Sequence, residues 1–185
     1  ILISYHVPSL KRNNPNDALS MIVTSKILSQ SANEILPNLD TEKASIMNLS
    51  SHYMIVNEHD SLFQILAQLK PDIDPLNATQ QIQDALDQIY YNPLTLQSIN
   101  ASKTYLSSEW NYINDTPEEL NRLTSYALAM DLELILLNDY IKHINAITPK
   151  DISDGISKYL NTSNRSVTIL TPSLSGKSNY KHIYG

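Results

Sequence analysis

The chain has 185 residues, of which 42% are hydrophobic and 17% charged; this is enough apolar material for one folded domain and argues against global disorder. Its 13 basic and 19 acidic residues give a net charge of −6, and an acidic surface repels the phosphates of nucleic acids. The absence of cysteine excludes disulfides, thiolate catalysis and cysteine-ligated zinc.

No stretch approaches the roughly 20 apolar residues that a membrane-spanning helix needs, so the sequence predicts no membrane span. The chain begins at Ile1 with neither Met nor a basic segment, and this start does not resemble a signal peptide. We therefore expect a piece of a longer protein, or one whose N-terminus has been removed. Glycine occurs only at positions 155, 176 and 185, which excludes glycine-rich phosphate loops over most of the chain.

The first half of the chain predicts strands around one helix. Alternation of apolar and polar residues predicts strands, and apolar residues three and four positions apart predict helices. The segment 29–40 is ambiguous, because Pro37 limits its helical spacing to a short turn. From the N-terminus we expect a strand at 1–7, a helix at 15–29 capped by Asn14, and two strands at 43–56 and 62–70 paired across a polar break at 57–60.

The second half of the chain predicts mainly helices. Thr116-Pro117-Glu118-Glu119 and Thr148-Pro149-Lys150-Asp151 each offer a capping hydroxyl, a proline at the first helical position and acids that favour the helix dipole. In the second, Asp151 stands where the acid of a capping box lies. The apolar run 132–141 is either a central buried helix or, in part, an interface. We expect helices at 76–91, 94–113, 117–128 and 149–160, and a strand at 167–170.

The order of these segments predicts an α+β fold, a mostly antiparallel sheet with a block of helices packed on one face. No internal repeat and no linker-like stretch divides the chain. We expect a single α+β domain over residues 1–172, followed by a polar and poorly ordered tail over residues 173–185.

The motifs that most resemble metal-binding or catalytic sites are incomplete. Ile55-Val56-Asn57-Glu58-His59 has the Glu-His end of an inverted zinc motif, but Ile55 stands where the first histidine must be. The segment is also a predicted turn, whereas that motif needs a helix. No Gly-x-Ser-x-Gly nucleophile elbow is present. The residue patterns therefore predict no catalytic, metal-binding or cofactor-binding residue, and the substrate-binding residues are unknown.

Other polar and aromatic residues have structural explanations. Glu118 and Glu119 face different directions on a helix and serve its dipole, whereas Asp72 and Asp74 lie beside prolines in a predicted turn. His6 is interpreted as a core or rim residue that bonds to the backbone. Aromatic residues at helical spacing are expected in the core, namely Tyr90, Tyr91, Tyr105 and Trp110. Asn-x-Ser/Thr triplets are attributed to chance at Asn48, Asn77, Asn100, Asn114 and Asn161.

The order of several motifs resembles one half of an insulinase/pitrilysin-type zinc metallopeptidase, a family that includes the mitochondrial processing peptidase. Tyr5-His6-Val7-Pro8, followed by Asn16-Asp17-Ala18-Leu19, is similar to the start of a family domain. Asp60-Ser61-Leu62-Phe63-Gln64-Ile65 is similar to a later strand. The most specific match joins Ile147-Thr148-Pro149-Lys150-Asp151-Ile152 with the segment 164–172, which resembles the family's final helix and last strand. The resemblance spans about residues 3 to 173.

This resemblance implies a fold of the LuxS/processing-peptidase type and a parent protein built of two such domains. Active members carry the inverted zinc motif in one domain, while the partner domain helps to enclose and bind the substrate peptide. The chain resembles the partner type, so we expect no cofactor in it and zinc only in a partner domain. Many partner domains hold the substrate with an Arg and a Tyr, but residues 39–45 contain neither, and no binding residue is carried over.

The resemblance implies two alternative functions. The first is a non-catalytic domain that helps a zinc-bearing domain to enclose and bind an unstructured peptide. The alternative is a purely structural or assembly subunit without a role in proteolysis. Both imply a second peptidase-type domain or subunit as partner, and neither gives this chain alone an enzymatic activity or a nucleic-acid ligand. By resemblance we expect a periplasmic or cell-envelope location, with a cytoplasmic one as the alternative.

Overall fold

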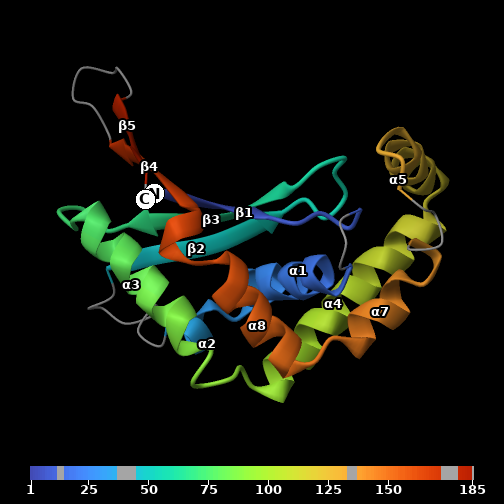
Figure 1. Ribbon diagram of the computed structural model, residues 1–185, viewed down its shortest axis with the longest axis horizontal. Coiled ribbons are helices and arrows are strands. Elements are labelled where there is room, and N and C mark those ends of the chain that lie inside the picture. The colour runs from blue at the N-terminus through green and yellow to red at the C-terminus, as the bar shows by residue number, and fades with distance from the viewer. Residues whose placement is uncertain (12–14, 37–44, 133–136, 172–178, 185) are drawn as a thin grey trace.

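A computed structural model describes residues 1–11, 15–36, 45–132, 137–171 and 179–184 (Figure 1). The predicted N-cap Asn14 and most of the ambiguous segment 29–40 lie outside these residues. The elements are β1 (Leu2–Val7), α1 (Pro15–Gln30), α2 (Ala32–Ile35), β2 (Ile46–Tyr53), β3 (Ser61–Leu69), α3 (Pro75–Gln88), α4 (Leu96–Asp115), α5 (Pro117–Ala129), α7 (Tyr140–Ala146), α8 (Pro149–Tyr159), the 3-10 turn η1 (Thr162–Asn164), β4 (Arg165–Thr171) and β5 (Asn179–Tyr184).

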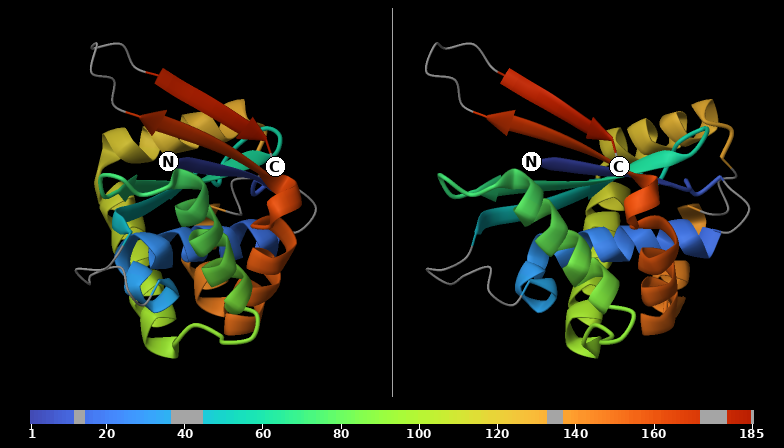
Figure 2. Two further views of the ribbon diagram at one scale, coloured as in Figure 1. Left: turned by 90° about the vertical axis from the view of Figure 1, so that its left-hand side faces the viewer. Right: turned by 60° about the vertical axis from the view of Figure 1, so that its left-hand side comes forward.

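The strands form one antiparallel sheet in the order β2-β3-β1-β4-β5. β1 is central, since its Ile3 pairs with Ile65 of β3 on one side and with Val167 of β4 on the other. The helices α1, α3, α4, α7 and α8 lie on one side of this sheet, whereas α5 stands apart at one end (Figure 1, Figure 2). The predicted α+β class, with an antiparallel sheet and helices on one face, is confirmed.

The C-terminal segment differs from the expected tail. Asn179–Tyr184 form an edge strand, β5, which pairs with β4 from Thr171↔Asn179 to Ser166↔Tyr184. Residues 179–184 thus form a strand within the stretch that the sequence led us to expect as a polar tail. The physical reason is that this segment carries β-favouring tyrosines and an isoleucine, and β4 offers it a row of backbone partners.

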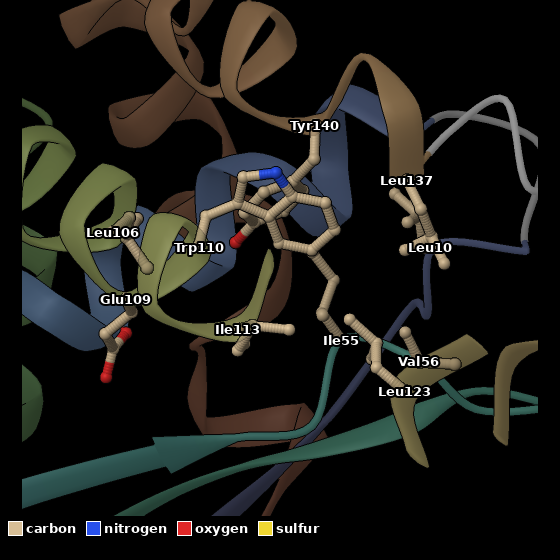
Figure 3. Close-up of a pocket in the computed structure, with 10 residues that line it drawn as sticks. All are labelled: Leu10, Ile55, Val56, Leu106, Glu109, Trp110, Ile113, Leu123, Leu137 and Tyr140. Carbon is tan, nitrogen blue, oxygen red and sulfur yellow. The ribbon is translucent and has the colours of Figure 1, made fainter. Parts of the chain in front are cut away.

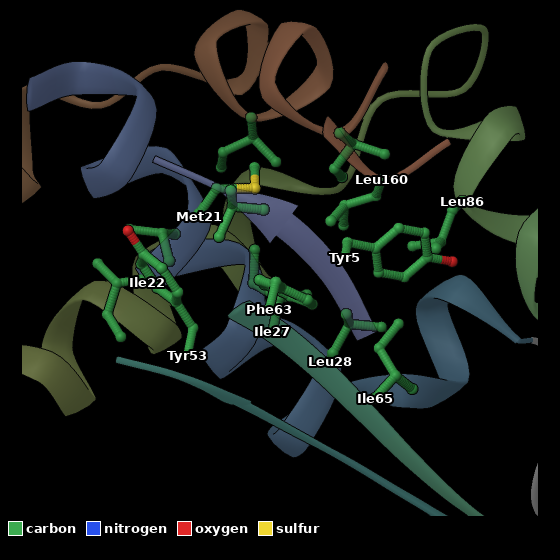
Figure 4. Packing of buried hydrophobic residues seen from close by; sticks show 14 of the residues in the cluster. Tyr5, Met21, Ile22, Ile27, Leu28, Tyr53, Phe63, Ile65, Leu86 and Leu160 are labelled. Atoms are coloured by element: carbon green, nitrogen blue, oxygen red, sulfur yellow. The ribbon is translucent and has the colours of Figure 1, made fainter. Parts of the chain in front are cut away.

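The hydrophobic core lies between the sheet and the helices (Figure 4). The inward-facing Tyr5 of β1 and Phe63 of β3 are fully buried, as are Met21 and Ile27 of α1. Because α1 packs against β2 as well as α4, α7 and α8, it buries side chains around most of its circumference rather than along one stripe. This central helix packs on one face of the sheet, and α3, α4, α7 and α8 lie on the same side (Figure 1, Figure 2).

A buried hydrogen-bond cluster joins β1, α3 and the end of α8. The hydroxyl of Tyr5 donates to Oε1 of Gln83 at 3.0 Å, and Nη1 of Arg165 donates to the same oxygen at 3.3 Å. Nε2 of Gln83 donates to the carbonyl of Leu160 at 2.8 Å. Burial raises the pKa of Tyr5 well above its ordinary value, so the phenol stays protonated and serves as the donor.

The two predicted helix starts differ in their capping. At α8, the Thr148 hydroxyl accepts from the N–H of Asp151 at 3.2 Å, and the Asp151 carboxylate accepts from the N–H of Thr148 at 2.7 Å, which confirms the capping box. α5 begins at Pro117 as predicted, but the Thr116 hydroxyl does not cap it and donates instead to the carbonyl of Tyr112 at 2.8 Å. The expected cap at Thr116 is wrong because the last turn of α4 adjoins α5 and offers a free carbonyl.

β2 is an edge strand, and α1 closes part of its free edge. The Ser29 hydroxyl accepts from the N–H of Ser51 and donates to the carbonyl of Ser51, both at 3.1 Å. The Ser51 hydroxyl donates in turn to the carbonyl of Ser25 at 2.6 Å. One serine of α1 therefore satisfies both backbone groups of an edge residue that would otherwise be unpaired.

Candidate functional site

The face of the sheet opposite the helices, here called the open face, carries exposed side chains. Along β1 and β3 successive residues alternate between the buried core and this face. Leu62 and Leu66 of β3 lie on it and are 49% and 56% exposed, although leucine is normally buried. The helices α1, α3, α4, α7 and α8 lie on the other side of the sheet, whereas α5 stands at one end of it (Figure 1, Figure 2). Two exposed leucines on this broad face make it a candidate surface for contact with another molecule or domain.

Polar side chains cross the middle of the open face, and we call them the polar row. The strand register places His52 of β2 opposite Gln64 of β3, Gln64 opposite Ser4 of β1, and Ser4 opposite Ser166 of β4. Because adjacent strands lie about 4.8 Å apart, the row is continuous across the sheet. Nε2 of Gln64 and the Ser4 hydroxyl are 3.5 Å apart. An imidazole, an amide and two hydroxyls thus offer both donors and acceptors to a molecule on this face.

Leucines flank the polar row on both sides. Leu66 pairs with Leu2 on one side, and Leu62 pairs with His6 on the other. His6 lies at the rim as predicted, but its exposed imidazole contacts a carboxylate, since Nε2 lies 3.7 Å from Oδ2 of Asp60. An extended peptide needs hydrogen-bond partners for its backbone and apolar surface for its side chains, and the open face offers both.

The incomplete zinc motif does not fit a metal ion. Glu58 and His59 are exposed between β2 and β3, and Ile55 contributes no donor atom. In the part of the chain that the structure describes, no group of three His, Cys, Asp or Glu side chains is placed to hold a metal. The interpretation as a solvated turn holds for Glu58 and His59, whereas Val56 is buried and Ile55 packs against the core.

The acidic residues singled out in the sequence have structural roles. Glu118 and Glu119 lie in the first turn of α5, where Glu119 forms an ion pair with Arg122. Asp74 caps α3, its Oδ1 accepting from the N–H of Leu76 at 3.1 Å, and Asp72 adopts a positive φ of 66° in the preceding turn. The interpretations of these four residues as helix-dipole and turn residues are confirmed.

The expectation that the helical aromatic residues lie in the core is wrong for three tyrosines. Tyr90, Tyr91 and Tyr105 are 57%, 79% and 44% exposed. Tyr90 and Tyr91 pack edge to face, and the Lys26 ammonium lies 4.8 Å from the ring centroid of Tyr105. The ring of tyrosine makes it look like a core residue in a helical pattern, but its hydroxyl favours contact with water. Trp110 is partly buried and packs against the core, as expected.

Comparison with family models and with curated proteins finds no match to this chain. Solved structures do match. The inactive peptidase domain of a putative zinc protease from Bordetella parapertussis has a TM-score of 0.77 at 16% identity, over 100% of this chain and 89% of that one. A protease from Helicobacter pylori has a TM-score of 0.75 at 18% identity, over 89% and 39%. A peptidase M16 inactive domain from Pseudomonas fluorescens has a TM-score of 0.66 at 13% identity, over 89% and 38%.

The chain has the fold of an M16 peptidase inactive domain. The resemblance to the non-catalytic half of an insulinase/pitrilysin-type peptidase is thereby confirmed at the level of the fold. The chain spans 39% of the length of the Helicobacter pylori protease, whereas it spans nearly all of the Bordetella parapertussis domain. Among the described helices, none combines the length and the hydropathy required to cross a membrane.

Sequence reasoning did not identify the open face. The signal was present in β1, where Ser4 and His6 alternate with buried residues. It was weaker in β3, because Leu62 and Leu66 made the strand look apolar on both faces. Which face a helix block covers is set by tertiary packing, and exposed leucines cannot be told from core leucines by residue type.

Proposed function

We propose that this chain is a non-catalytic domain of an M16-type zinc peptidase, in which it helps to enclose and bind a substrate peptide for a zinc-bearing partner domain. The observation that carries this proposal is the polar row on the open face, flanked by exposed Leu62 and Leu66. In this function the chain binds the peptide, and the zinc and the hydrolytic step belong to the partner domain.

The chemistry of the open face favours an extended, unstructured peptide. Gln64 and His52 present an amide and an imidazole that can bond to peptide N–H and C=O groups. Leu62 and Leu66 offer apolar contact to alternating side chains of a peptide in β conformation. The net charge of −6 also suits a peptide or protein partner better than a nucleic acid.

The partner is a second peptidase-type domain, in the same chain or in a second subunit. The Helicobacter pylori protease supports this, since the present chain spans only 39% of it and thus leaves room for further domains. A periplasmic or cell-envelope location is part of the proposal. It is supported by a neighbour described as the periplasmic protease PqqL from Escherichia coli, with a TM-score of 0.65 and 9% identity.

The test is peptide hydrolysis by the parent protein together with its zinc-bearing domain. Leu66→Ser on the open face should raise KM for an unstructured peptide by about 10-fold, the equivalent of losing part of one leucine's burial, and leave kcat nearly unchanged. The matched control is Leu96→Ser at the start of α4, where the leucine is 64% exposed and lies away from the sheet. Cleavage that proceeds equally well without this domain would contradict the proposal.

The alternative is a structural or assembly subunit in which the open face contacts another domain rather than a peptide. A neighbour in a structure of Complex III2 from Candida albicans, with a TM-score of 0.69 and 10% identity, shares the fold and favours this candidate. It predicts that Leu66→Ser weakens association with the partner domain without changing KM. Size-exclusion chromatography of the variant with its partner distinguishes the two functions.

A further inference from the structure

A pocket separate from the open face lies between α4, α5 and α7 (Figure 3). It has a volume of about 130 Å³. Leu106, Glu109, Trp110 and Ile113 come from α4, Leu123 from α5 and Tyr140 from α7, and the connections after β1 and β2 and before α7 supply Leu10, Ile55, Val56 and Leu137. Most of its lining is therefore aliphatic or aromatic.

The loose packing of α5 explains why this space exists. Of all the residues of α5, Ala127 is the one that is buried, and the helix contacts mainly α4. Tyr126 of α5 reaches Met54, the residue that follows β2, and its hydroxyl lies 3.5 Å from Sδ of Met54. Leu123 of α5 lies beside Ile55 in the lining of the pocket, as Figure 3 shows.

The pocket contains an unpaired hydroxyl. Tyr140 is more than nine-tenths buried, with 8% of its surface exposed, and its ring packs against that of Trp110 at a centroid distance of 4.9 Å. Within the described residues, the Tyr140 hydroxyl makes no hydrogen bond. The unpaired polar atoms that are completely enclosed there are Ser102 Oγ and Arg165 Nε, so the Tyr140 hydroxyl retains some accessible surface. Because Tyr140 lines the pocket, we take its hydroxyl as the donor available to a ligand there.

The charge of the pocket is already neutralised. Among the described residues that line it, Glu109 is the charged one, and it forms an ion pair with Lys26 at 2.9 Å. Burial raises the pKa of Tyr140 above its ordinary value, and the nearby Glu109 carboxylate raises it further, so the phenol stays protonated. A charged ligand would lose its hydration in the pocket without gaining an oppositely charged partner. A neutral ligand avoids this cost.

The size and polarity of the pocket define the occupant. An apolar cavity of about 150 Å³ holds one benzene ring, and most of the described side chains that line this pocket are aliphatic or aromatic. We propose that the pocket binds one small neutral aromatic molecule of about six to nine non-hydrogen atoms, whose hydrogen-bond acceptor meets the hydroxyl of Tyr140. Trp110 and Leu123 contact its ring.

The experiment uses two ligands of the same shape, acetophenone and isopropylbenzene, because only the first carries an acceptor. Trp110 is the single tryptophan, so the ¹⁵N-labelled chain gives one indole N–H signal in the NMR spectrum, and that signal lies at the site. Both ligands should shift it, and acetophenone should bind roughly 3- to 10-fold more tightly, the value of one hydrogen bond.

Tyr140→Phe keeps the ring and removes the hydroxyl, and it should abolish the preference for acetophenone while isopropylbenzene still binds. Tyr112→Phe is the matched control, since Tyr112 is 67% exposed on α4 and does not line the pocket. If neither ligand shifts the indole signal at its saturating concentration in water, the pocket is not a binding site for such molecules. Equal affinities in the unmodified chain, or a preference that persists in Tyr140→Phe, would overturn the role of the hydroxyl.

Discussion

Gly155 is the residue at which α8 lies nearest to α1. A Cβ atom at this position would lie 2.7 Å from Cε of Met21 and 2.7 Å from Oγ of Ser20. Met21 is fully buried, and the Ser20 hydroxyl is held by the carbonyl of Asp17 at 2.8 Å. Neither neighbour can move away freely, so glycine is required here by close helix packing rather than by a turn.

We predict that Gly155→Ala destabilises the chain by about 1 kcal/mol in urea denaturation. Overpacking costs about 1–3 kcal/mol, and the higher helix propensity of alanine offsets about 1 kcal/mol of it. Ser157→Ala on the exposed side of α8 is the control and should change the free energy of unfolding by less than about 0.5 kcal/mol. A Gly155→Ala variant as stable as the unmodified chain would show that α1 and α8 separate at little cost.

At the scale of the elements, the sequences around Thr116 and Thr148 look alike, but the two hydroxyls have different partners. The Thr148 hydroxyl caps α8, whereas the Thr116 hydroxyl bonds to the preceding helix α4. Thr148→Ala removes half of a capping box and should cost about 1 kcal/mol. Thr116→Ala leaves the α5 N-terminus as it was, because the hydroxyl bonds to Tyr112, and should cost less than half as much. Thermal unfolding of the two variants checks this ranking, and equal losses would refute it.

The starts and ends of elements could be predicted from sequence wherever proline or a capping residue fixes them locally. Pro117 and Pro149 begin helices in the structure as the sequence predicts. β5 could not be predicted, since its stability comes from pairing with β4 rather than from its own alternation. The exposure of Tyr91 likewise depends on where the chain turns after α3, which residue type does not reveal.

At the scale of the whole molecule, three buried phenols link stability to pH. Burial raises the pKa values of Tyr5, Tyr53 and Tyr140 above their ordinary value of 10 in the folded chain. The folded state therefore holds these protons more tightly than the unfolded state. This stabilisation is complete below pH 10 and is lost as the pH rises above 10 toward the folded-state pKa values.

We predict that the free energy of unfolding falls above pH 10, with each phenol contributing up to about 1.4 kcal/mol per pH unit. Urea denaturation at several pH values measures the slope, and tyrosinate absorbance should rise together with unfolding. Tyr53→Phe keeps the ring and should reduce the slope, although it also removes the hydrogen bond to the carbonyl of Pro8. A slope that is the same in this variant would show that Tyr53 titrates without unfolding.

The gap in the zinc motif could be predicted from the sequence, but the open face could not. The gap at Ile55 in the zinc motif is visible in the sequence, because one missing ligand suffices to exclude that motif. The polar row depends instead on the register of four strands, which brings Ser4 beside Ser166 from opposite ends of the chain. Such long-range pairing carries no local signal.

The serine that closes the edge of β2 also bears on how copies of this chain behave when concentrated. An unpaired strand edge invites a second molecule to extend the sheet, which is the first step of fibril growth. With both backbone groups of Ser51 held by the Ser29 hydroxyl, that growth is interrupted in the middle of the strand. Ser29→Ala should therefore shorten the lag before thioflavin-positive aggregates form, while Ser107→Ala on α4 leaves it unchanged.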